Sequence, residues 1–154
     1  MYGFRTFSLM LTLVALLLLA APVRADDLPF QAADVIVTYT DIEDLGDGNY
    51  RYTFDVAGTG TTLGDFTGNG VADYSFGTEL LSNASMILVG ADGSISFTFD
   101  GYLDSETGEL EDVTFAIFDG TDAYAGASGG GTITGMADAT NGAIINFDGV
   151  ITTP

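Results

Sequence analysis

The stretch DFTGNGVAD, residues 65–73, has the residue types and spacing of a calcium-binding loop. Such loops place side-chain oxygens at alternate positions, a glycine at position six and a backbone carbonyl ligand at position seven. The candidate ligands are Asp65, Thr67, Asn69, the carbonyl of Val71, and Asp73. The match is imperfect, because a Thr stands at position three and position twelve lacks the usual bidentate Glu. Ca²⁺ binding at this loop is therefore one of two hypotheses.

The same stretch also fits a β-hairpin. Asn-Gly is a preferred pair for a tight hairpin turn, and Gly68-Asn69-Gly70 stands between residues typical of strands. In this interpretation one strand ends at Thr67 and the next begins at Val71. Apart from the calcium possibility, the sequence predicts no cofactor.

Aromatic residues alternate with polar ones in three other segments, which places them on one face of each predicted strand. They are Tyr50, Tyr52, Phe54, Phe97, Phe99 and Phe115. Such faces either fill the core of a small barrel or line a cavity for an apolar ligand. The core interpretation is favoured, and these six residues are the candidate wall if a cavity exists.

The residue types that carry most catalysis are missing from the chain. It has no Cys and no His, which excludes disulfides, thiol nucleophiles, a Ser-His-Asp triad and ordinary zinc sites. Any catalysis would rest on Asp, Glu, Tyr, hydroxyl groups or Arg51. The composition therefore favours a binding or structural protein over an enzyme.

Residues 1–25 are typical of a cleaved signal peptide. Arg5 provides the positive end, an apolar run covers residues 9–21, and Val-Arg-Ala at residues 23–25 offers small side chains for cleavage. The run is shorter than the ~20 residues that span a bilayer core. We therefore predict an exported protein, secreted or periplasmic, whose mature chain starts at Asp26 and has no membrane span.

The chain is strongly acidic, with 22 Asp and Glu against three Arg and a net charge of −19. Arg51 is the only cation that remains if residues 1–25 are removed. A field of that sign repels phosphate backbones and anionic membrane surfaces, so nucleic-acid binding is excluded and lipid-surface binding is disfavoured. The acidity is explained either by solubility, for example in salty surroundings, or by attraction of cations such as Ca²⁺.

The elements that must position these residues are β-strands. After an extended leader over residues 26–33, alternating or β-branched stretches predict strands, and turn signals such as Asp47-Gly48 separate several of them. We expect the strands at residues 35–39, 50–56, 61–67, 71–76, 84–89, 94–103, 110–118, 131–137 and 143–152. Short strands spaced by turns predict one all-β domain over residues 34–154. It is a sandwich or a closed barrel, and a barrel has the advantage of removing exposed edges.

Residues 126–131 are glycine-rich but do not form a phosphate loop, since they lack its Lys and precede a predicted strand. Glycines there permit positive φ or close backbone approach at a barrel corner. We expect Tyr124 and Ala127 to pack inward beside them.

Three stretches resemble, in this order and spacing, segments of small exported bacterial proteins with an allene oxide cyclase-like (dirigent-like) β-barrel. They are residues 58–67 (GTGTTLGDFT), 91–94 (ADGS) and 118–129 (FDGTDAYAGASG). The third is similar to a glycine-rich hairpin shared with plant allene oxide cyclases and dirigent proteins. This chain departs from the pattern at Thr62, where a His is common. It also departs at Asp119 and Asp122, where Gly is usual, and at Ala123, which replaces a basic residue.

The resemblance implies a single antiparallel eight-stranded barrel, which is often a homotrimer in the plant relatives. It also implies a hydrophobic substrate in or at the barrel, because the plant proteins cyclise an epoxy fatty acid or direct phenolic coupling. None of their catalytic residues can be placed on this chain. Three functions stay open: a non-catalytic binding or envelope-associated module for a small hydrophobic ligand, an allene oxide cyclase-type isomerase or cyclase, and a calcium-stabilised surface protein.

Overall fold

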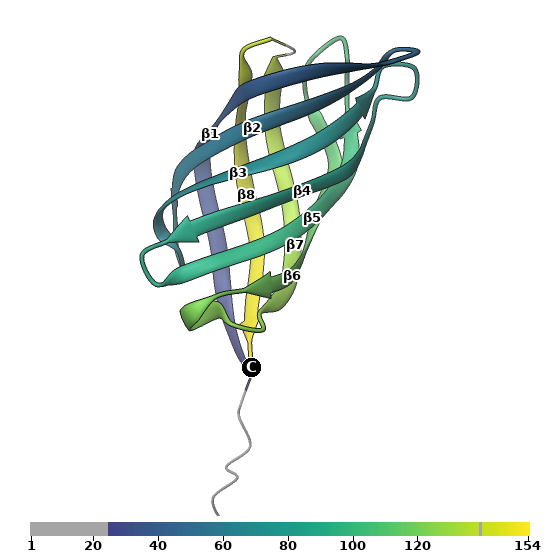
Figure 1. Cartoon of the computed structure of the whole chain (residues 1–154). Helices are drawn as coiled ribbons and strands as arrows, with labels where there is room; N and C mark the ends of the chain where they lie inside the picture. Colours follow the sequence, from purple (N-terminus) through teal and green to yellow (C-terminus); the bar gives the residue numbers. More distant parts are fainter. Residues whose placement is uncertain (1–24, 139) are drawn as a thin grey trace, which may run out of the picture.

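The chain folds into a closed barrel of eight antiparallel strands, seen in a computed structural model that describes residues 25–138 and 140–154 (Figure 1). The strands are β1 (Asp26–Gly46), β2 (Asn49–Gly60), β3 (Gly64–Ser75), β4 (Leu80–Gly90), β5 (Gly93–Leu103), β6 (Leu110–Gly120), β7 (Ser128–Asp138) and β8 (Gly142–Thr153). Each strand pairs with the next, and β8 closes the barrel on β1. The prediction of an all-β barrel is thus confirmed.

The predicted signal peptide falls almost entirely on residues 1–24, which lie outside the described residues. In the described part of the chain the one helical element is the short 3₁₀ helix η1 (Asp122–Tyr124). No helix there is long and apolar enough to cross a bilayer.

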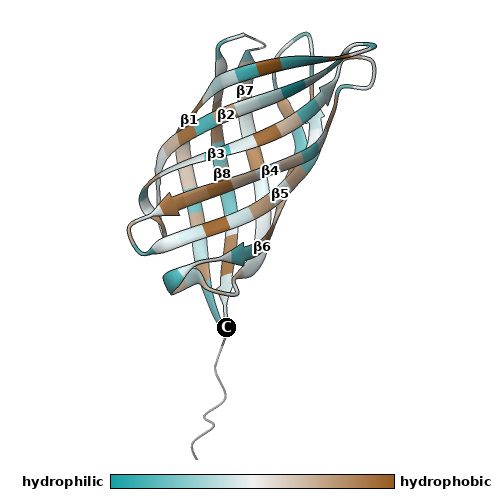
Figure 2. Cartoon of the chain, viewed as in Figure 1, coloured by the Kyte–Doolittle hydropathy of each residue, from teal (hydrophilic) through white to brown (hydrophobic). Residues whose placement is uncertain are grey.

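Alternation along each strand sends one set of side chains into the barrel and the other to its surface, and apolar and polar residues follow one another along the ribbons (Figure 2). On β6, Val113, Phe115 and Ile117 are buried while their neighbours are exposed. The Tyr50-to-Val56 alternation on β2 behaves as predicted, since Phe54 and Val56 are buried in the interior.

The two ends of the barrel differ (Figure 1). The connections β1–β2, β3–β4, β5–β6 and β7–β8 lie at one end, which we call the loop end. The other three connections, η1 and the C-terminus lie at the opposite end, which we call the closed end.

Five phenylalanines fill the closed end. Their ring centroids lie between 5.2 and 6.5 Å apart in several tilted and edge-on pairs, the geometry that aromatic rings prefer. They are Phe30, Phe66, Phe97, Phe115 and Phe147, all of them buried. Tyr124 of η1 is buried at the same end and donates its hydroxyl to the carbonyl of Thr62 at 2.9 Å. Tyr124 and Ala127 are both buried, so the prediction that they pack inward is confirmed.

Residues 26–33 differ from the predicted leader, because they form the first part of β1 and pair with β8 from Asp26–Thr153 to Ala32–Phe147. Phe30 and Ala32 face inward at alternate positions, and this burial holds the segment in the barrel. A bulge at Asp34, where φ is +54°, then shifts the register of the strand.

The predicted hairpin at residues 68–70 is also wrong, because β3 runs without interruption from Gly64 to Ser75. The two glycines make room for the neighbouring strands instead. A Cβ on Gly70 would lie 2.6 Å from the Phe54 ring and from the Ser85 carbonyl oxygen, and one on Gly68 would overlap the carbonyl oxygen of Ile87. The turn that joins β2 to β3 lies at residues 61–63.

Candidate ligand-binding site

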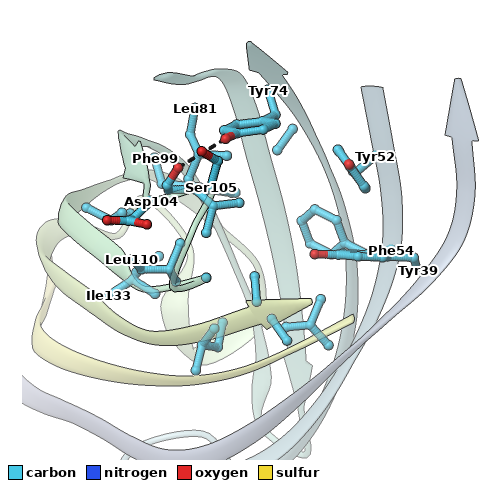
Figure 3. A pocket seen from close by; sticks show the side chains of 18 of the residues that line it. Tyr39, Tyr52, Phe54, Tyr74, Leu81, Phe99, Asp104, Ser105, Leu110 and Ile133 are labelled. Atoms are coloured by element: carbon cyan, nitrogen blue, oxygen red, sulfur yellow. Dashed lines mark hydrogen bonds between the residues drawn. The ribbon is translucent and has the colours of Figure 1, made fainter. Parts of the chain in front are cut away.

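A half-open apolar pocket occupies the loop end of the barrel (Figure 3). Its volume is about 130 Å³, similar to the roughly 150 Å³ apolar cavity that holds benzene in another protein. Its wall comes from every strand of the barrel and from the β3–β4 and β5–β6 connections. The lining residues are Val37, Tyr39, Tyr52, Phe54, Ala72, Tyr74, Phe76, Leu81, Met86, Phe99, Leu103, Asp104, Ser105, Gly108, Leu110, Val113, Ile133, Ala137, Ala143 and Ile145.

Three of the six aromatic residues predicted as a cavity wall do line this pocket, namely Tyr52, Phe54 and Phe99. Tyr50 is half-buried beside them, with its ring centroid 6.1 Å from that of Phe76. The remaining two, Phe97 and Phe115, belong to the phenylalanine cluster of the closed end. The alternatives of filled core and cavity are therefore both realised, at opposite ends of one barrel.

Tyr39 and Tyr74 are wall residues that the sequence reasoning missed. Tyr39 extends the inward alternation of Val35 and Val37 on β1, and that period was the available signal. Tyr74 follows Ala72 at the same spacing, but the supposed turn in the middle of β3 obscured this. The β5–β6 loop residues carried no local signal, because they approach the pocket only after the barrel has closed.

The tyrosine hydroxyls are the main polar groups on the pocket wall. The ring centroids of Tyr39 and Tyr52 are 4.9 Å apart, and the Tyr39 hydroxyl points inward beside Phe54 (Figure 3). Tyr74 donates its hydroxyl to the carbonyl of Leu103 at 3.1 Å. Within residues 25–138 and 140–154, no protein group forms a hydrogen bond with the hydroxyl of Tyr39 or Tyr52. These two donors are therefore free to meet a ligand.

Burial raises the pKa of these phenols, which are already neutral at physiological pH. It is the largest cause that raises the pKa of Tyr39 to about 12, with smaller contributions from Tyr52 and the charge of Asp138. Burial likewise raises the pKa of Tyr52 and of Tyr74, and the Glu79 carboxylate adds to the effect at Tyr74. The pocket thus offers neutral hydrogen-bond donors through the physiological range of pH.

Two carboxylates lie at the pocket, one in its wall and one bound to a lining residue. Asp104 lies in its wall and accepts backbone N–H groups of Glu106 at 2.8 Å and Thr107 at 2.7 Å. These hydrogen bonds, the one from Thr107 first, hold the pKa of Asp104 below its ordinary value. Glu79 accepts the N–H of the lining residue Ser105 at 2.9 Å and its hydroxyl at 2.6 Å.

The five residues predicted as calcium ligands do not converge on one point. Asp65, Thr67, Asn69, Val71 and Asp73 all lie on β3, where alternate residues are roughly 7 Å apart. An extended strand cannot wrap its own side chains around a cation as a loop does. In the part of the chain that the structure describes, no three acidic, histidine or cysteine side chains meet as a metal site would require.

Asp73 has a different partner. Its carboxylate accepts Nε of Arg51 at 2.7 Å and Nη2 at 2.9 Å, and Nδ2 of Asn83 donates to it at 3.0 Å. The hydrogen bond from Arg51 is the main cause that lowers the pKa of Asp73. The pair ties β2 to β3 on the outer surface of the pocket wall, one residue from Tyr52 and Tyr74.

Comparison with known proteins gives no match to a family model, a curated protein or a solved structure. The geometry of the pocket is therefore the main indication of function. Its walls are apolar, its free polar groups are neutral donors, and its carboxylate is hydrogen-bonded and ionised. Such a set can bind and orient a ligand, whereas a carboxylate with a lowered pKa is a weak proton acceptor.

Proposed function

We propose that this protein is an exported binding module that holds a small, mainly apolar ligand in the loop end of its barrel. The observation that carries the proposal is the pocket itself, with the inward Tyr39 hydroxyl free to donate to a ligand. Ligand sites are typically concave and apolar with a few convergent polar groups, and this pocket fits that description. Export is supported by the signal-peptide pattern of residues 1–25.

The size of the pocket indicates a ligand group of about one aromatic ring. A matched pair of probes then separates the apolar contribution from the hydrogen bond: acetophenone has a carbonyl acceptor, and ethylbenzene has a similar shape without one. Both should bind, as measured by ligand-detected NMR or calorimetry. Replacing Tyr39 by Phe should weaken acetophenone about two- to tenfold, the value of one hydrogen bond, and leave ethylbenzene nearly unchanged.

Two matched controls make the test specific. Tyr124→Phe removes a buried phenol hydroxyl at the closed end and should leave both affinities unchanged. Ala143→Leu adds bulk to the pocket wall and should abolish binding of both probes, whereas Ala116→Leu makes the same change on an exposed position of β6 and should not. Binding that survives Ala143→Leu, or no binding of either probe, would refute the proposal.

A cyclase or isomerase of the allene oxide cyclase type is the second candidate. The feature in its favour is a phenol donor, Tyr39, inside an apolar pocket with a carboxylate, Asp104, in its wall. Steady turnover of an epoxy fatty acid or of a phenoxyl radical by the purified protein would establish it. The homotrimer implied by the resemblance stays a prediction, to be measured by light scattering after gel filtration.

A further inference from the structure

The charged groups at the pocket mouth are all negative, and this restricts the class of ligand that the proposed pocket can bind. Carboxylates approach the pocket from the β3–β4 connection, the β5–β6 connection and the end of β7. Asp104 lies in the wall, Glu79 binds the lining residue Ser105, and Asp138 at the end of β7 is close enough for its charge to raise the pKa of Tyr39.

These three groups are ionised at neutral pH. Hydrogen bonds from Ser105 lower the pKa of Glu79, and those from Thr107 and Glu106 lower that of Asp104. Hydrogen bonds from the Thr140 and Asn141 turn bring the pKa of Asp138 to about 2. The mouth therefore carries negative charge in any solution in which the protein is folded near neutrality.

No described cation balances this charge. Arg51 is the one Lys or Arg within residues 25–138 and 140–154, and it is held on the outer face by its bidentate pair with Asp73. The inner wall below the mouth includes the aromatic rings of Tyr39, Tyr52 and Phe99 among aliphatic side chains. Aromatic faces attract organic cations through their electron-rich π systems.

We propose that the pocket takes organic cations: an apolar body of about one aromatic ring enters the barrel, and an ammonium group stays at the acidic mouth. A neutral ligand of the same shape binds more weakly, and a carboxylate of the same shape binds most weakly. The site is the cavity described above, so this inference rests on the proposed function. The carboxylates decide the charge of its occupant.

The expected selectivity is measurable but modest. In water at low salt, one unit charge about 10 Å from a charged ligand changes the affinity of that ligand by roughly twofold. Together with the aromatic wall, the carboxylates should favour the cation about fivefold over the neutral ligand. The anion should be disfavoured by about the same factor.

Three probes share one ring and differ in charge: benzylamine, benzyl alcohol and benzoate. Their affinities for the purified protein, measured by calorimetry at neutral pH, should fall in that order. In about 0.5 M NaCl, where the Debye length falls to about 4 Å, the three affinities should converge toward that of benzyl alcohol. Benzoate binding as tightly as benzylamine at low salt would overturn the inference while leaving the proposed function intact.

Variants distinguish the pocket from the acidic surface as a whole. Asp104→Asn keeps an oxygen that can accept the loop N–H groups, so the fold should hold, as a thermal melt will show. The variant should reduce the benzylamine preference over benzyl alcohol by about twofold. The control Asp92→Asn removes the same charge from the β4–β5 turn at the closed end and should change nothing.

Two further outcomes would overturn the inference or the proposed function. Benzylamine binding that persists in Ala143→Leu, or that responds equally to the two Asn variants, would show general attraction to an acidic protein and would overturn the inference. If benzyl alcohol and benzylamine both fail to bind, the proposed function fails together with the inference.

Discussion

Replacing Arg51 by Ala should destabilise the barrel measurably, because the substitution removes the ion-pair partner of a buried carboxylate. Asp73 is only 9% exposed and receives two hydrogen bonds from the guanidinium, at 2.7 and 2.9 Å. A bidentate charge-assisted pair of this geometry is among the stronger polar interactions in proteins. Without Arg51, the amide of Asn83 is the only one of its three side-chain hydrogen bonds that remains.

The magnitude follows from how much solvent reaches the pair. Removing one partner of a fully buried ion pair costs about 3–5 kcal/mol. The Arg51 side chain is 42% exposed, so water can partly replace it, and Asn83 continues to donate. We therefore expect a loss of about 1–3 kcal/mol in the free energy of unfolding. For a domain of this size that corresponds to a drop of roughly 3–10 °C in Tm.

The dependence on pH gives this prediction a specific sign. The pKa of Asp73 in the folded protein lies below its ordinary value of 3.8, chiefly because Arg51 donates to its carboxylate. A lowered folded pKa stabilises the protein above the unfolded pKa, and this contribution is lost as pH falls through the folded pKa. The difference between the wild type and Arg51→Ala should therefore be full near neutrality and shrink below about pH 4.

Urea denaturation followed by circular dichroism, at neutral pH and at about pH 3, measures this difference. Glu43→Gln is the control: its carboxylate faces Arg51 across β1 and β2 but forms no hydrogen bond with it among the described residues, so its effect should stay within about 0.5 kcal/mol. If the free energy of unfolding of Arg51→Ala equals that of the wild type at neutral pH, the stabilising role of the ion pair is refuted. A loss that is equally large at pH 3 would show that packing, and not the ion pair, carries it.

Three further predictions concern the interior. Gly70→Ala should cost about 1–3 kcal/mol by urea denaturation and weaken acetophenone binding, because the added Cβ would lie 2.6 Å from the Phe54 ring and from a carbonyl of β4. Stability should fall as pH rises from 10 to about 12, because unfolded Tyr39 ionises before folded Tyr39 does, and Tyr39→Phe should reduce that fall in alkaline urea titrations. Tyr124→Phe should lower stability at neutral pH by about 0.5–1.5 kcal/mol through loss of its hydrogen bond to Thr62.

The strands that could be predicted from the sequence are those whose signal is local. Alternation with period two decides which side chains share an inward face, so Phe54, Phe97 and Phe115 can be placed on such faces from the sequence, and all three are buried. Glycine clusters at corners are local too, and the burial of Tyr124 and Ala127 followed from them.

What could not be predicted depends on neighbours across the sheet. Gly70 looked like half of an Asn-Gly turn, yet it is needed because the Phe54 ring of β2 lies over it. The calcium hypothesis relied on the same bend, since Asp65 and Asp73 converge only if the chain turns between them, whereas β3 is continuous there; Ca²⁺ binding stays a prediction. Likewise, nothing local shows that Phe30 belongs to β1 and packs against Phe147 of β8.

The position of the pocket follows from where the tyrosine hydroxyls can meet water, a ligand or a hydrogen-bond acceptor. Tyr39 lies late in β1, Tyr52 early in β2 and Tyr74 late in β3, and because these strands are antiparallel, all three reach the same end of the barrel. A buried hydroxyl without a partner costs free energy, so tyrosines are stable near an opening or beside an acceptor. At the closed end the buried rings are phenylalanines, and Tyr124 has the Thr62 carbonyl as its acceptor. The pocket at the loop end is therefore not a packing defect. Its wall carries the hydroxyl groups that suit a space filled by solvent or by a ligand.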